Sequence, residues 1–163
     1  MTDEPTIMER SATPYVAITA KVTMADIGDV VPPLTQEVLG WLGAREIAPV
    51  GAPFWKYNIV DMVRGMEIEA GIATAEPLDD DGRIHAGVLP AGRYATLVHV
   101  GHPKTLMDAT ARLLEWADEQ GLNWDASPSP EGERWGCRLE IYHDEPGQDM
   151  NAWETELAFR LAD

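Results

Sequence analysis

The sequence predicts an α+β fold of duplicated β-α-β-β units, in which two antiparallel sheets form a central groove and one main helix packs on each sheet. Two observations lead to this prediction. The order strand, helix, strand, strand occurs twice, in residues 14–74 and again in residues 90–161. The spacing of apolar residues alternates between every second position, typical of strands, and every third or fourth position, typical of helices. Such a duplication implies an approximate two-fold axis.

Length and composition fit one domain. The 163 residues, 45% of them hydrophobic, are enough for a sizeable core. Because 28 acidic residues face 12 basic ones, the formal net charge is −16. That charge disfavours direct binding to nucleic acid or to an anionic membrane, and it favours neutral or cationic partners. Solubility, or a salt-rich or acid-tolerant host, is the other explanation for this acidity.

The sequence also bears on the compartment. Residues 1–5 are acidic and lack the basic and apolar segments of a signal peptide. No run approaches the roughly 20 apolar residues that cross a membrane. The single cysteine, Cys137, excludes an internal disulfide and alternates with apolar residues, so we expect it to be buried. A cytoplasmic protein is therefore expected.

The first half begins after a loose N-terminal arm. Asp26 suits the N-cap of the following helix, whose firmest part is residues 34–42, because Pro32 and Pro33 should break or restart it. An apolar stripe through Val31 and Leu42 should pack on a sheet. The expected arm, strand, helix and two further strands of this half are residues 1–13, 15–22, 26–43, 54–61 and 66–74.

The second half opens at residues 89–101. A tight turn at residues 90–92 leads into a strand with apolar residues on both faces. The next helix carries an apolar stripe through Leu113 and ends at Gly121, and Pro128 lies in the loop that follows. The expected strand, helix, loop and two strands are residues 93–101, 103–120, 123–132, 135–143 and 153–161.

The pleat of the strands predicts which side chains enter the groove. In strand 135–143 the odd positions are apolar and suit the face under the helix, so Arg138, Glu140 and Tyr142 should face the groove. Laying residues 54–57 on residues 139–142 gives two equivalent positions in the first half. The four side chains expected to converge are Trp55, Tyr57, Glu140 and Tyr142.

A carboxylate among aromatic rings has two chemical uses. It can neutralise a lipophilic cation, with each cation–π contact contributing roughly 0.5 to 2 kcal/mol. It can also act as a general base or acid where an apolar wall raises its pKa. A third interpretation pairs Glu140 with Arg138, or with an exposed lysine, on a solvated face. The glutamates of the closing strands fit a solvated face or the groove rim: Glu67, Glu69, Glu154 and Glu156.

Other chemistry has no motif in the sequence. The acidic turn at residues 79–82 lacks the ligand spacing of a calcium loop. The serines all fall in expected loops, outside any nucleophile elbow. The histidines have no metal-site spacing, so we expect neither a metal nor a cofactor: His85, His99, His102 and His143.

An ordered set of segments runs through both halves of the chain. The segments are Gly51-Ala52-Pro53-Phe54 with Tyr57, Leu89-Pro90-Ala91-Gly92, Tyr94-Ala95, His99-Val100-Gly101-His102-Pro103, Leu113-Leu114-Glu115-Trp116, Leu139-Glu140-Ile141-Tyr142 and Thr155-Glu156-Leu157. This set resembles the GyrI-like small-molecule-binding domain, which is also the effector-binding part of many multidrug-sensing transcription regulators. The resemblance covers roughly residues 14–161.

The resemblance implies a groove for bulky aromatic, often cationic, compounds. The family's central acidic contact falls on Glu140, and its aromatic companions fall on Tyr57 and Tyr142. We add three further ligand-binding candidates: Trp55, Trp135 and Met66. The alternation of side chains along the strand places Trp135 on the helix side.

The sequence departs from the family pattern at two places. His102 stands where a proline is common, and the extended loop of residues 123–133 is a candidate lid. The acidic, proline-containing residues before residue 14 do not predict a DNA-binding helix pair, so we expect a stand-alone member.

Stand-alone members are similar to two kinds of protein. Some sequester toxic compounds, and others are hydrolases that open the cyclopropane of genotoxic natural products. In the hydrolase hypothesis Glu140 is the base that positions water, and Tyr57 or Tyr142 donates a hydrogen bond to the carbonyl that gains charge. A third hypothesis is an inhibitory protein that contacts a DNA topoisomerase through its acidic surface. We expect a binder, with the hydrolase as the alternative.

Overall fold

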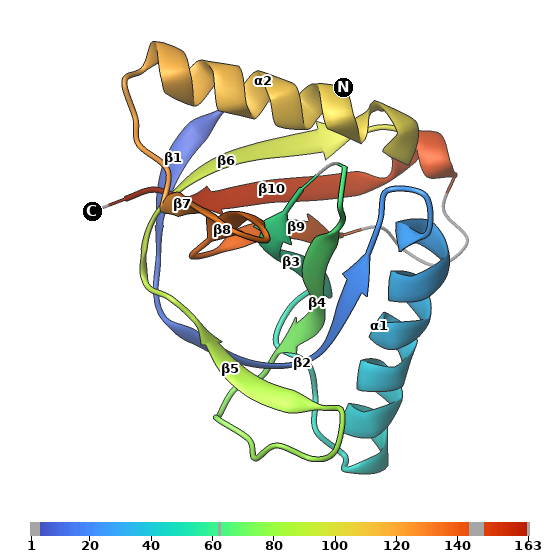
Figure 1. Ribbon diagram of the computed structural model, residues 1–163. Helices are drawn as coiled ribbons and strands as arrows, with labels where there is room; N and C mark the ends of the chain where they lie inside the picture. The colour runs from blue at the N-terminus through green and yellow to red at the C-terminus, as the bar shows by residue number, and fades with distance from the viewer. Residues whose placement is uncertain (1–3, 62, 144–148, 163) are drawn as a thin grey trace.

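The computed structural model describes residues 4–61, 63–143 and 149–162. It confirms the α+β class, with many strands and two main helices in the described part of the chain (Figure 1). The elements in order are β1 Thr6–Arg10, β2 Thr13–Val22, α1 Ile27–Ala44, β3 Phe54–Val60, β4 Met66–Ala73, β5 His85–Leu89, β6 Gly92–Val100, η1 Pro103–Thr105, α2 Leu106–Glu119, β7 Ala126–Ser129, β8 Gly132–Trp135, β9 Arg138–Tyr142, η2 Met150–Ala152 and β10 Glu154–Arg160.

The strands form one curled antiparallel sheet in the order β1-β6-β10-β9-β3-β4-β2-β5. Each half has the same arrangement, because β10 lies between β6 and β9 just as β4 lies between β2 and β3. The two expected sheets are joined where β3 pairs with β9, with Trp55 directly opposite Glu140. Without this pairing, β3 and β9 would be edge strands with backbone N–H and C=O groups that lack partners in the sheet.

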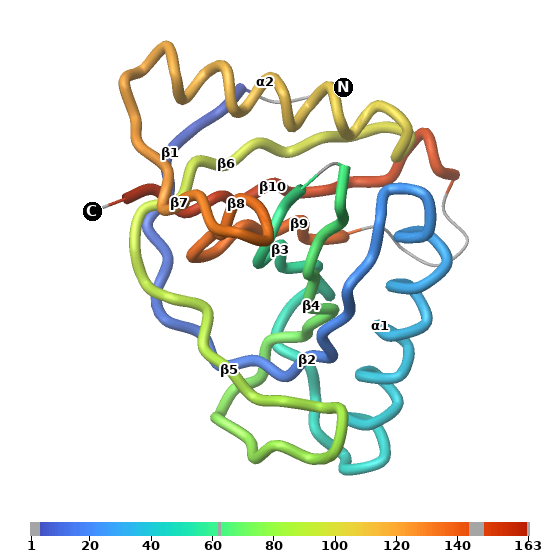
Figure 2. The backbone as a smooth tube through the Cα atoms, in the orientation of Figure 1, coloured from blue at the N-terminus to red at the C-terminus, as the bar shows by residue number. Residues whose placement is uncertain are grey.

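Both helices lie on the face of the sheet that carries Glu140, whereas the sequence placed them on the opposite face. Glu140 pairs with Leu157 across β9 and β10, and paired residues share a face. Leu157 packs in the core cluster beneath α2. On the other face, Leu139 packs with Tyr15 of β2 and Tyr94 of β6, because the curl of the sheet brings these distant strands together. Figure 2 shows α1 beside β2 and α2 along β6.

Helix α1 is continuous through the two prolines that were expected to break it. Pro32 and Pro33 lie in its second turn, where each removes one backbone donor. The carbonyls that lose a partner belong to Gly28 and Asp29, both of which are exposed residues, so water can satisfy them. The apolar stripe packs as expected, with Val38 and other α1 residues against β2 and β4.

The N-terminal arm is not loose throughout. Residues Thr6–Arg10 form β1, which pairs antiparallel with β6 from Thr6 opposite Thr96 to Arg10 opposite Gly92. Pairing with a strand rich in branched residues orders this part of the arm at the edge of the sheet.

The expected loop and lid of residues 123–133 contains a β-hairpin instead. Strands β7 and β8 pair with each other, and β8 pairs with β3 at Ile59 and Val60. Gly132 has φ +139°, and a Cβ there would lie 2.8 Å from the carbonyl oxygen of Val60, so glycine permits this close approach. The hairpin also interrupts the expected strand 135–143 before Arg138, where β9 begins.

Candidate functional site

A groove of about 510 Å³ lies between α1 and α2 on their shared face of the sheet. One wall comes from the start of α1 and the residues before it, and the other from η1 and the first turns of α2. The sheet contributes the floor through β3, β9 and β10. The lining residues are Met24, Ile27, Pro32, Thr35, Gln36, Pro53, Trp55, Tyr57, Pro103, Leu106, Met107, Thr110, Glu140, Tyr142, Trp153 and Thr155.

Glu140 and two tyrosines form the polar centre of the floor. The hydroxyl of Tyr57 donates a hydrogen bond of 2.8 Å to Oε1 of Glu140, and the hydroxyl of Tyr142 donates one of 2.6 Å to the same oxygen. No hydrogen-bond partner for Oε2 is found among the residues that the structure describes. One carboxylate oxygen is therefore fixed by the protein, and the other is available to a ligand.

The register of β3 and β9 explains why these side chains converge. Since Trp55 lies opposite Glu140, Tyr57 and Tyr142 each lie two residues further along their strands, on the same face. The ring of Trp55 meets that of Tyr142 edge to face, with centroids 5.1 Å apart. When the two halves are exchanged, this contact corresponds to the hydrogen bond from Tyr57 to Glu140. One half thus supplies an indole where the other supplies an acid.

Burial controls the electrostatics of this centre. It raises the pKa of Glu140, while the hydrogen bonds from Tyr142 and Tyr57 and the charge of Arg138 act in the opposite direction. Burial and the neighbouring carboxylate also raise the pKa of both phenols far above its ordinary value. The phenols therefore remain protonated donors.

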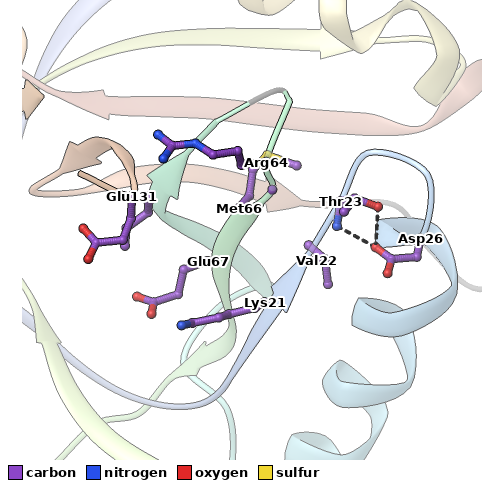
Figure 3. Close-up of a pocket in the computed structure, with 10 residues that line it drawn as sticks. Lys21, Val22, Thr23, Asp26, Arg64, Met66, Glu67 and Glu131 are labelled. Carbon is purple, nitrogen blue, oxygen red and sulfur yellow. Dashed lines mark hydrogen bonds between the residues drawn. The ribbon is translucent and has the colours of Figure 1, made fainter. Parts of the chain in front are cut away.

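Two predicted ligand-binding residues lie away from the groove. Trp135 is 5% exposed and packs under α2 with Phe159, and its indole N–H donates to Glu133. Met66 is 4% exposed and lines a second pocket of about 260 Å³ with Lys21 and Arg64 (Figure 3). Trp135 is the last residue of β8 and lies before the interruption that precedes β9. Met66 is the first residue of β4, and β3 lies between β4 and β9 in the sheet.

Glu69 and Glu156 were candidates for the groove rim, but they lie on the face of the sheet that carries Leu139. Glu69 is 4% exposed and accepts hydrogen bonds from Tyr15 and Asn58. Burial raises its pKa, but the nearby Lys56 and these hydrogen bonds leave the pKa below its ordinary value. In the second half, Glu156 pairs with Arg10 and with His143. Both carboxylates serve the packing of the curled sheet.

Most of the groove walls come from residues that the sequence pattern did not indicate. Met24 and Met107 are 43% and 59% exposed and line the groove from its two sides. Leu106 belongs to the apolar stripe of α2, and only the curl of the sheet turns that end of the helix toward the groove. The one sequence signal that could have indicated the rim is a methionine next to the start of each main helix.

Neither a metal site nor a membrane span is present in the described residues. Within residues 4–61, 63–143 and 149–162, no three His, Cys, Asp or Glu side chains gather in a way that could hold a metal ion. In the same residues, no helix is both long enough and apolar enough to cross a membrane.

The comparison with protein families identifies the class of protein. Residues 3–162 match the GyrI-like small molecule binding domain. The chain therefore belongs to this family, as the ordered motifs indicated. No curated protein matches the chain.

Solved structures share the fold. The C-terminal domain of EcmrR has a TM-score of 0.74 and 20% identity, over 98% of this chain and 97% of that one. SAV2435 bound to tetraphenylphosphonium has a TM-score of 0.61 and 12% identity, over 98% and 94% of the two chains. A hydrolase from Listeria innocua has a TM-score of 0.67 and 12% identity, over 98% and 92%. In a DNA complex of EcmrR, with a TM-score of 0.75 and 21% identity, the match covers 97% of this chain but only 57% of that one.

Proposed function

We propose that this protein binds bulky aromatic, lipophilic compounds, cations above all, and that it sequesters drugs or toxins and so gives resistance to them. The observation that carries the proposal is the Glu140 carboxylate, held by Tyr57 and Tyr142 at the floor of an apolar groove, with one oxygen left to a ligand. A cation placed there gains both the carboxylate charge and the faces of the surrounding rings.

The size and the walls of the groove support this class of ligand. Its volume of about 510 Å³ lies within the range of roughly 300 to 1,000 Å³ that small-molecule sites occupy. Met24 and Met107 are flexible and polarizable, so the rim can adapt to ligands of different outline. SAV2435, which shares the fold, was solved with tetraphenylphosphonium, a lipophilic aromatic cation.

Calorimetric titration with tetraphenylphosphonium tests the proposal. We expect the Glu140→Gln variant to bind at least about tenfold more weakly than the wild type, because a tenfold change corresponds to about 1.4 kcal/mol and the lost interaction is a charged one. Glu9→Gln is the matched control, since it removes the same charge from an exposed position of β1. Equal affinity of the wild type and Glu140→Gln would remove the central acid from the account.

Hydrolysis of a cyclopropane is the second candidate, and it is favoured by Oε2 of Glu140, to which no residue in the described part of the chain donates. Oε2 would take a proton from water as the water oxygen bonds to a ring carbon. The ring carbon–carbon bond would break, and its electron pair would pass into a conjugated carbonyl that then takes up a proton. Tyr57 or Tyr142 would leave Oε1 and donate to that carbonyl.

Mass spectrometry separates the two functions. The protein is incubated with an excess of a cyclopropane-containing alkylating compound, and the water adduct is counted per molecule of protein. Adduct beyond one equivalent that depends on Glu140 supports the hydrolase, whereas binding without adduct supports the sequestering protein.

Contact with a DNA topoisomerase and a cytoplasmic location stay predictions. The first depends on the family resemblance and on the net charge of −16. A supercoiling assay with added protein tests it, because an inhibitor lowers the supercoiling rate in proportion to its concentration. An unchanged rate at saturating protein would contradict this part of the proposal.

A further inference from the structure

Arg138 is a positively charged residue that has no part in the proposed ligand contacts. Its guanidinium lies over three aromatic rings, 4.6 Å from the centroid of Phe159, 4.9 Å from Trp135 and 5.8 Å from Tyr57. Within the described residues, no carboxylate lies within ion-pair distance of it, and no hydrogen bond to its side chain is found. The rings therefore hold its position, since an arginine stacks readily on aromatic faces.

The position of Arg138 links it to the groove acid. It lies two residues before Glu140 in β9, on the same face, yet it does not line the groove. Tyr57 connects the two, because its ring lies below the guanidinium and its hydroxyl donates to Oε1 of Glu140. A cation over the ring makes the phenol a stronger donor, and the positive charge also acts on the carboxylate through space.

Arg138 is the charged neighbour of Glu140 at this centre. The phenols of Tyr57 and Tyr142 are neutral donors. The two helix walls and β10 contribute uncharged polar groups to the groove: Thr35, Gln36, Thr110 and Thr155. Glu133 of β8 acts on Arg138 rather than on Glu140. Arg138 is therefore the charged group that acts on Glu140 at the groove floor, beside burial and the hydrogen bonds from Tyr142 and Tyr57.

We propose that Arg138 is a positioning residue whose ring-held charge favours the ionised form of Glu140 in the groove and so widens the pH range over which the groove selects cations. The same charge repels a cation that is bound beside Glu140. Arg138 therefore widens the pH range of binding and lowers the affinity that a lone carboxylate would give. The binding arm of the test rests on the proposed function, whereas its spectroscopic arm does not.

The two effects of Arg138 have opposite signs, and this makes the proposal testable. Burial raises the pKa of Glu140, and Arg138 opposes that rise. Without the guanidinium, the carboxyl should take up its proton at higher pH. A cationic ligand should then bind more weakly at acidic pH, where the acid is neutral, and more tightly at alkaline pH, where the repulsion is gone.

The binding arm measures the affinity for tetraphenylphosphonium, which has no titratable group, across the pH range for the wild type, Arg138→Met and Arg138→Lys. For Arg138→Met we expect the midpoint of the pH profile to rise by about one unit, with affinity up about threefold on the alkaline side and down about tenfold on the acidic side. Arg138→Lys should restore a profile close to the wild type. Weakening by one constant factor at every pH would show a packing role and overturn the proposal.

The spectroscopic arm needs no ligand. The carboxyl carbon of Glu140, labelled with carbon-13 and assigned with Glu140→Gln, is titrated by NMR in the wild type and in Arg138→Met. A higher titration midpoint in the variant is expected, and an unchanged midpoint overturns the proposal even if no dye binds. Arg138→Gln, checked by circular dichroism, replaces the methionine variant if that one does not fold. Absence of tetraphenylphosphonium binding by the wild type would count against the proposed function alone.

Discussion

At the scale of single residues, the groove depends on a compromise made at Glu140. A carboxylate under apolar walls is costly to ionise, and two phenol donors with one nearby guanidinium reduce that cost without removing it. Both phenols donate to one oxygen, and no residue that the structure describes donates to the other, which faces the groove. A site that keeps a buried acid for a ligand gives up stability in exchange for binding.

This compromise predicts that Glu140→Gln stabilises the protein at neutral pH. Because the pKa of Glu140 is raised in the folded state, its favourable contribution is complete below its unfolded pKa and is lost as the pH rises through its folded pKa. Glutamine keeps an acceptor for both phenols and never ionises. Calorimetric unfolding should show equal stabilities near about pH 4 and a gain on the order of 1 kcal/mol for the variant near about pH 8. A variant that is less stable than the wild type at the higher pH would contradict the assignment.

The residue pattern predicted the convergence of the polar centre but not its surroundings. Trp55, Tyr57, Glu140 and Tyr142 follow from the alternation of side chains along two strands and from the repeat, both of which are local properties of the sequence. Trp135 could not be placed in the same way, because the strand is interrupted between it and Arg138. Residues 136 and 137 lie between β8 and β9, so the alternation of side chains cannot be counted across them from Arg138 back to Trp135.

At the scale of elements, the seam between β3 and β9 places the site. Pairing of these two strands sets Trp55 beside Glu140 and turns two sub-sheets into one. The joined sheet curls so that residues on the face of Leu139 pack against one another. The helices cover the other face, which carries Glu140. Apolar spacing predicted both helices, but the face that they cover depends on this pairing between halves, which no local pattern contains.

The hairpin of β7 and β8 is the element that differs most from expectation. Pro128 and Pro130 indicated a loop, yet β7 is an edge strand, where a missing backbone donor can face solvent. Arg64 also donates a hydrogen bond of 2.7 Å to the carbonyl of Pro130, which fastens the hairpin to the turn between β3 and β4. No residue of the hairpin lines the groove.

We therefore predict that loosening the hairpin lowers stability without changing ligand affinity. Gly132→Ala places a Cβ against the backbone of Val60, at φ +139°. Gly121→Ala is the control, since Gly121 has φ +71° but no atom within 4 Å of an added Cβ. Denaturant unfolding should show Gly132→Ala to be less stable than the control by on the order of 1 to 2 kcal/mol. A fall in tetraphenylphosphonium affinity specific to Gly132→Ala would restore the lid interpretation.

At the scale of the whole molecule, a net charge of −16 surrounds a groove whose floor carries one acid. A strongly negative field concentrates cations near the protein and speeds their arrival, whereas it has little effect on neutral compounds. Composition alone predicts a preference for cationic or neutral partners. The position of the groove within the field required the fold.

The field predicts a salt dependence that distinguishes cations from neutral ligands. Stopped-flow association of tetraphenylphosphonium should slow severalfold as ionic strength rises from about 0.01 to about 1 M, because the screening length falls from about 30 Å to about 3 Å. A neutral aromatic ligand of similar size should associate at a rate that changes little. Equal salt dependence of the two rates would indicate that the acidity serves solubility only.

The most direct test of the account is a crystal structure of the protein with tetraphenylphosphonium. We expect the ligand in the groove between α1 and α2, with its cationic centre near the free oxygen of Glu140 and its phenyl rings against Trp55 and Tyr142. Density for the ligand in the pocket beside Met66, or anywhere else with the groove empty, would contradict the assignment of this groove as the binding site.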